Sequence, residues 1–103
     1  MQSTDSWSCG ISKIMDTLSG KWRLNIIWVI SKHDNIGFNQ LKNNLPGITN
    51  MMLMRSLEAL TSEGYVSKNL FGDKPPLHSE YHLTIKSHKL LPLLLKLNDL
   101  ESS

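Results

Sequence analysis

The chain has 103 residues, of which 40% are hydrophobic and 19% are charged, with a net charge of +2. This size and composition predict a single folded domain and exclude a disordered chain, while the mild basic excess is compatible with nucleic acid without demanding it. A single cysteine, Cys9, excludes an intramolecular disulfide, and no apolar run is long enough to cross a bilayer. We therefore expect a cytoplasmic protein with no membrane partner.

Two helices are expected in the first third of the chain. Residues 1–8 are polar and are predicted to form a flexible N-terminal tail ahead of a single domain, residues 9–103. Apolar residues recur at helical spacing from Ile11 to Leu18 and predict a helix that ends at Ser19 and Gly20. A second helix, from residue 21 to about residue 32, is nearly apolar all round, which predicts a central place in the core.

A shorter helix is expected next. Phe38, Leu41 and Leu45 recur at helical spacing, and Pro46 and Gly47 then stop the helix. A tight turn must follow, because another apolar stripe begins a few residues later.

The helix after this turn is expected to begin with Thr49 or Asn50 as its cap and to end at Gly64 in the left-handed conformation. Its leucines share one narrow face, which predicts packing against the preceding helices. These are Leu53, Leu57 and Leu60.

A β-hairpin and a final helix complete the chain. Apolar and polar residues alternate over residues 65–71 and 80–84, and Gly, Asp, Lys and two Pro between them predict a hairpin with a long tip. The last helix, capped by Thr84, carries more leucine than one flank of a small domain can cover, which indicates a partner. Pro92 predicts a kink or the start of a new segment there. The whole order predicts a winged helix-turn-helix: mainly α, with a small β-hairpin wing.

In such a unit the second helix of the pair enters the DNA major groove. The leucine face turns the opposite side outward, so base contacts are predicted for Asn50, Met51, Met54 and Arg55. Arg55 can pair with guanine and Asn50 with adenine, while the methionines can pack against thymine methyl groups or lie near the backbone. Phosphate contacts are predicted for Asn39, Lys42, Thr49, Lys68 and Lys74. An ordinary surface helix and a solvated hairpin are the alternatives.

Other chemistry has little support in the sequence. Cys9 precedes the first helix, where the helix dipole favours a thiolate, and the alternative is a buried, inert thiol. The four histidines lack metal-binding spacing, and no catalytic triad, phosphate loop or carboxylate pair is present. We therefore predict no metal, no cofactor and no enzyme activity.

The chain resembles the HxlR-type regulators, a bacterial winged helix-turn-helix family related in shape to the MarR group. The likeness runs from Cys9 to about Leu100. The motifs that carry it are Gly20-Lys21-Trp22, Phe38 with Leu41, Leu45-Pro46-Gly47-Ile48, Leu53 with Leu57 and Leu60, Glu63-Gly64, Pro75-Pro76, Glu80-Tyr81 and Leu83-Thr84.

The resemblance implies a homodimeric transcription factor, repressor or activator, whose two recognition helices bind an inverted-repeat operator in successive major grooves of double-stranded DNA. It places the dimer interface in the terminal helices and implies that Cys9 matches a cysteine with which several members sense oxidants, quinones or aldehydes. Ser87 stands where the family usually has glycine. The dimerisation residues expected on this basis are Leu90, Leu93, Leu94, Leu97 and Leu100.

A second hypothesis is a protein-interaction module that keeps the winged fold and has lost DNA binding. It is motivated by Met51 and Met54, which occupy positions of the exposed face that are usually polar in the family. Methionine-rich faces suit adaptable protein partners.

Overall fold

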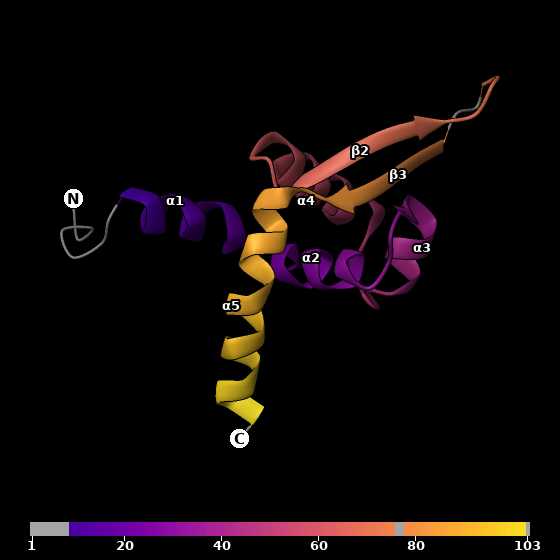
Figure 1. Cartoon of the computed structure of the whole chain (residues 1–103). Helices are drawn as coiled ribbons and strands as arrows, with labels where there is room; N and C mark the ends of the chain where they lie inside the picture. Colours follow the sequence, from indigo (N-terminus) through magenta and orange to yellow (C-terminus); the bar gives the residue numbers. More distant parts are fainter. Residues whose placement is uncertain (1–8, 76–77, 103) are drawn as a thin grey trace.

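The computed structural model describes residues 9–75 and 78–102, so the predicted tail lies outside the described residues. Five helices and three strands follow one another in this part of the chain (Figure 1). They are α1 Cys9–Leu18, α2 Arg23–Ser31, β1 Ile36–Gly37, α3 Phe38–Asn43, α4 Asn50–Ser62, β2 Val66–Phe71, β3 His78–Leu83 and α5 Ile85–Ser102. The fold is mainly helical with a small antiparallel sheet, as the sequence predicts.

The core is built around α2, whose central position is confirmed. Ile26, Ile27 and Ile30 of this helix have no exposed surface. They pack with the leucine stripe of α4, formed by Leu53, Leu57 and Leu60, and with buried residues of the sheet. The apolar residues of α2 that do not face this core, Leu24 and Trp28, remain partly exposed.

The sheet has three strands in the order β1-β3-β2, so the predicted two-stranded hairpin is incomplete. The added strand β1 pairs Ile36 with Tyr81 and Gly37 with Glu80. Two residues are too few for an alternating pattern, and only their pairing with β3 makes them a strand. The wing, which consists of β2, β3 and the loop between them, extends away from the helices (Figure 1).

The turn between α3 and α4 differs from the prediction in one detail. α3 ends at Asn43, so Leu45 is not helical. Leu45 and Ile48 are nevertheless buried, because the turn, with Gly47 at a φ of 94°, directs both side chains into the core. Tertiary packing rather than helical spacing thus explains the apolar residue at position 45.

The predicted ends of α4 are confirmed. The Thr49 hydroxyl accepts a hydrogen bond from the Met52 N–H at 3.1 Å, as expected of an N-cap residue. At the other end Gly64 has a φ of 84°, a left-handed conformation that glycine adopts without a steric penalty. The orientation of α4 is therefore defined at both termini and along its buried stripe.

α5 is one helix that continues through Pro92, so a new segment does not begin there. Proline removes one backbone hydrogen bond inside a helix. Pro92 is exposed, which lets water reach the carbonyl left without a partner. Within the described residues, no helix combines the length and the hydrophobicity needed to cross a membrane.

The start of α5 is fastened to the corner between α4 and β2. The hydroxyl of Ser87, which is fully buried, donates to the backbone oxygen of Tyr65 at 2.5 Å. The hydroxyl of Thr84 donates to the backbone oxygen of Gly64 at 2.6 Å and caps α5 by accepting from the Ser87 N–H. α5 therefore continues from the core without a free hinge at its first turn.

Candidate nucleic-acid interface

The outward face of α4 carries all four residues for which base contacts are predicted. Asn50, Met51, Met54 and Arg55 are exposed, while the leucine stripe on the other side of the helix is buried. Met51 and Met54 are 60% and 53% exposed. The arrangement leaves one side of the helix available to a ligand while the other side holds it to the core.

A groove of about 840 Å³ runs between this helix and the wing. Asn39 at the start of α3, Met54 and Glu58 of α4, and Lys68 and Tyr81 of the wing line it. Three residues of the predicted site, Asn39, Met54 and Lys68, are thus brought together from three elements. We call this space the α4–wing groove.

The charges of the groove are mixed. Lys68 is an exposed cation on the wing side, and Glu58 is an exposed anion on the helix side. Burial raises the pKa of Tyr81, the carboxylate of Glu58 raises it further, and a hydrogen bond with Ser79 acts in the opposite direction. Tyr81 is consequently a neutral hydroxyl at physiological pH. Because the Glu58 carboxylate opposes the Lys68 ammonium, the groove is less basic than a surface built only for phosphate.

Sequence reasoning did not assign several residues that line the groove: Phe38, Gln40, Leu57, Thr61, Ser62, His78 and Ser79. The strand residues among them are brought to the groove by the register of the wing, in which Lys68 pairs with Tyr81 and Leu70 with Ser79. This register follows from the pairing of the strands and is not visible in the spacing along either strand alone.

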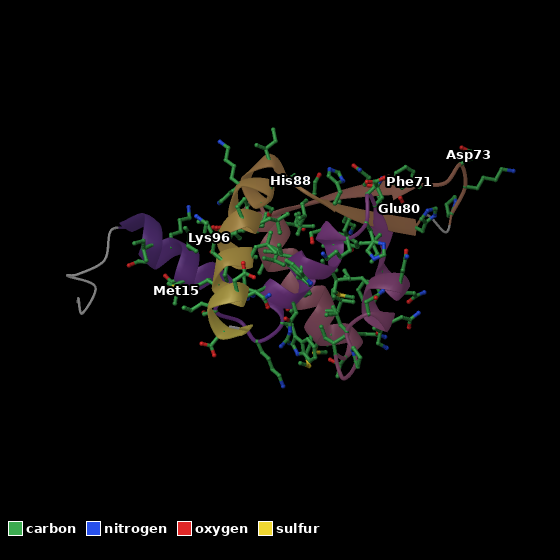
Figure 2. All side chains as sticks on the ribbon, turned by 60° about the horizontal axis from the view of Figure 1, so that its bottom comes forward. Met15, Phe71, Asp73, Glu80, His88 and Lys96 are labelled. Carbon is green, nitrogen blue, oxygen red and sulfur yellow. The ribbon has the colours of Figure 1, made fainter. Side chains whose placement is uncertain are left out.

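The remaining predicted phosphate contacts lie outside the groove lining. Lys42 is half-buried in the last turn of α3, and Thr49 is exposed at the start of α4. Lys74 is exposed in the loop of the wing, next to Asp73, which Figure 2 labels at the wing tip. The predicted phosphate contacts are therefore distributed over α3, the start of α4 and the wing, and only Asn39 and Lys68 of them line the groove.

Contacts between side chains join the two strands of the wing. The rings of Phe71 in β2 and His78 in β3 stack with their centroids 5.7 Å apart. Within β3 itself, His78 Nε2 lies 3.4 Å from a Glu80 carboxylate oxygen. Closer to the core, Asn69 Nδ2 lies 3.3 Å from His82 Nδ1. The two cross-strand pairs, Phe71–His78 and Asn69–His82, stabilise the hairpin against slipping out of register.

Away from the wing, α1 and the second half of α5 extend from the body of the molecule (Figure 1), and both helices carry exposed apolar side chains, such as Met15, which Figure 2 labels. Among the predicted dimerisation residues, Leu93, Leu97 and Leu100 are 57%, 59% and 72% exposed, whereas Leu90 and Leu94 are half-buried against the core of their own chain. From Leu95 to Glu101 every residue of α5 is exposed. The other exposed apolar residues of these two helices were not among the predicted dimerisation residues; they are Ile11, Ile14, Met15, Ile85 and Leu95.

Cys9 is the first residue of α1, and its side chain lies outside what the structure describes. The histidines are spread over the loop after α2, β3 and α5. Within residues 9–75 and 78–102, no group of three or more His, Cys, Asp or Glu side chains is placed to hold a metal ion.

Comparison with known proteins identifies the fold. A family model described as an HxlR-like helix-turn-helix matches residues 17–103. An uncharacterized HTH-type transcriptional regulator of Halalkalibacterium halodurans is 34% identical over 83 residues, which are 81% of this chain and 73% of the relative. The structure of a protein described as a MarR-family transcriptional regulator from Porphyromonas gingivalis W83 matches with a TM-score of 0.82 and 31% identity, covering 94% of this chain and 93% of that one. The redox regulator HypR in its reduced form matches with a TM-score of 0.78 and 26% identity, covering 87% of each chain.

Proposed function

Since the chain belongs to the HxlR-like helix-turn-helix family of transcriptional regulators, we propose that it binds an inverted-repeat operator as a homodimer in the cytoplasm. The observation that carries this proposal is the outward face of α4, where Asn50 and Arg55 are exposed beside the α4–wing groove. The family is one of regulators, and no catalytic step is proposed for it.

Arg55 is the strongest candidate for direct reading of a base. Its planar guanidinium matches the two acceptors of guanine in the major groove, and a good bidentate pair contributes about 1–3 kcal/mol of discrimination. Asn50 at the first turn of α4 can pair in the same way with adenine. Both lie in the N-terminal half of the helix, the part that reaches base edges in helix-turn-helix proteins.

Phosphate contacts would hold the helix in register with the DNA. Lys68 and Asn39 approach the backbone from the α4–wing groove, and Lys74 does so from the wing tip. The Thr49 oxygen already accepts a bond from the Met52 N–H, which leaves its own proton free to donate to a phosphate. Because Glu58 repels phosphate, we expect the backbone to pass closer to the wing than to the C-terminal half of α4.

The exposed apolar residues of α1 and of the second half of α5 support the proposed homodimer. Leu93, Leu97 and Leu100 cannot reach the core of their own chain, and a second copy would cover them. A two-fold axis at this end would separate the two α4 helices so that they meet half-sites about 34–36 Å apart, one turn of DNA.

The decisive test is DNA selection from a random-sequence library followed by mobility-shift titration of the parent and Arg55→Ala. We expect an enriched inverted repeat, about five- to 150-fold weaker binding by Arg55→Ala, and a steep loss of affinity with salt as counterions are released. Lys96→Ala removes an exposed charge far from the wing, at a position where the dimer is expected to be unaffected, and serves as the matched control. If no sequence is enriched, or if Arg55→Ala binds the enriched DNA as the parent does, the assignment of α4 is wrong.

A second function is favoured by one observation, the exposure of Met51 and Met54 on the same face. In this alternative the winged fold binds another protein and not DNA. It predicts no shifted DNA even at low salt, together with a stoichiometric protein partner that is lost from the Met51→Lys, Met54→Lys double variant.

We also propose that Cys9 makes the regulator responsive to oxidants or electrophiles. Its position at the first residue of α1 supports this, since the N-terminus of a helix favours a thiolate. The fold is similar to that of HypR, described as a redox regulator. With one cysteine per chain, a disulfide would join two subunits or a small thiol. Oxidant or quinone treatment should change operator binding by the parent and leave Cys9→Ser unaffected; an equal response of both proteins would contradict the proposal.

A further inference from the structure

Two methionines occupy the face of α4 that carries Arg55. Met51 and Met54 are three residues apart, and Arg55 is four residues from Met51, so the three side chains are neighbours on the helix surface. More than half of each methionine side chain is exposed. A thioether is a weak acceptor and no donor, so neither residue can read a base by hydrogen bonding.

These methionines are not needed to hold α4 in place. Leu53, Leu57 and Leu60 form the buried stripe, and Met52 is the methionine of this helix that packs, half-buried, against the core. An apolar side chain on the exposed side gains nothing from the fold itself. Any further contact of these side chains comes from a molecule that the face binds.

Resting on the proposed function, we propose that Met51 and Met54 are specificity-determining residues that read the C5-methyl groups of thymine in the major groove. Thymine presents there the only methyl group of the four bases. The flexible, unbranched methionine side chain adapts to such a small apolar target. Over cytosine the same side chain would cover an amino group and leave it without a partner, which penalises that base.

The neighbouring groups favour DNA over an apolar protein surface as the occupant. Asn50 and Arg55 flank the methionines with groups that match base edges, and the capped N-terminus of α4 adds the positive end of the helix dipole. Lys68 stands across the α4–wing groove, which Met54 also lines. An anionic ligand with apolar methyl groups in a wide groove fits this combination.

The test begins with the best DNA sequence selected from a random library and resynthesises it with deoxyuridine in place of one thymidine at a time. Deoxyuridine lacks only the methyl group. We expect one or two positions in each half-site at which this change weakens binding about fourfold, the effect of exposing one group of methylene size. At these positions 5-methyldeoxycytidine should bind better than deoxycytidine.

Variants then connect the methyl effect to the methionines. In Met51→Gln and Met54→Gln, which keep nearly the same shape, the ratio of thymidine to deoxyuridine affinity should fall to about one at the position that each residue contacts. Met51→Leu and Met54→Leu should keep the ratio, and so should Met15→Gln, which changes an equally exposed methionine of α1. The ratio is insensitive to a general loss of stability, because both DNA molecules meet the same protein.

Two results would overturn the inference while leaving the proposed function intact. One is equal binding of thymidine and deoxyuridine at every position of an enriched operator. The other is a methyl effect that both glutamine variants retain. Failure to enrich any DNA would overturn the proposed function and this inference together.

Discussion

The leucine stripe of α4 and the leucines in the second half of α5 differ in how far they are buried. Leu53, Leu57 and Leu60 of α4 are almost completely buried, whereas Leu97 and Leu100 of α5 are mostly exposed. Both helices present apolar stripes of similar chemistry. The difference is that α4 meets α2 and the sheet in its own chain, while the second half of α5 extends beyond them (Figure 1). One stripe therefore completes the fold, and the other is left for the second copy of the proposed dimer to cover.

This comparison separates two sources of stability. Burial in the core of one chain does not depend on protein concentration, whereas burial between two chains does. Substitutions in the two helices should thus be distinguishable by how their effects change on dilution.

The largest effect is expected in α4. Leu60→Ala removes a fully buried side chain and should lower the free energy of unfolding by about 2–5 kcal/mol, because it leaves a cavity beside α2. Urea denaturation at several protein concentrations would measure it. Leu100→Ala on α5 is the matched control, and at concentrations where the chain is monomeric it should change stability by less than about 0.5 kcal/mol. Equal losses in both variants would remove the distinction between the helices.

The next effect concerns assembly. Leu97→Lys would bring an unpaired ammonium group into the proposed dimer interface, and we expect the dimer dissociation constant to rise about a hundredfold, since burying such a charge costs several kcal/mol. Sedimentation velocity would detect the monomer, and operator affinity should fall with it. Lys96→Ala, at the preceding exposed position, should remain dimeric. A Leu97→Lys protein that sediments like the parent would place the interface elsewhere.

The smallest effect on stability is expected when the N-cap of α4 is removed. Thr49→Ala removes the hydroxyl that accepts from the Met52 N–H and should lower stability by about 1 kcal/mol. Thr61→Ala, an exposed position inside the same helix, should be nearly neutral. A thermal melt of both variants gives the comparison; a loss as large in Thr61→Ala would show that the cap is not the cause.

Features encoded by neighbouring residues were predictable from the sequence. α4 is the best example, since Thr49, the leucine stripe and Gly64 define its start, its buried face and its end. The strand β1 was missed because it exists only through pairing with β3, which is more than 40 residues away in the chain. Two alternatives stayed open at Pro92, a kink or the start of a new segment, because the local penalty of proline says nothing about the helix on either side; the continuous α5 excludes the second.

The candidate site divides in the same way. The exposed side of α4, with Arg55 and the two methionines, follows from helical periodicity alone. The α4–wing groove does not, because Asn39 and Tyr81 meet there only after β3 has paired with both β1 and β2. Exposure of Leu97 could be suspected from the surplus of leucine, but only the path of α5 shows which leucines the chain leaves uncovered.

The buried hydroxyl of Ser87 has a consequence for the shape of the operator. Through its hydrogen bond to Tyr65 it ties α5, the helix of the proposed dimer interface, to the segment between α4 and β2, where Thr84 also holds Gly64. In the proposed dimer, the two α4 helices would then be held at one fixed distance and orientation. One extra base pair between the half-sites would rotate the major groove of the second half-site by about 34–36° around the DNA axis. The fixed start of α5 would not let the second α4 helix follow this rotation. The spacing of the operator would thus depend on the two hydroxyls, of Ser87 and Thr84, that hold this corner of the fold.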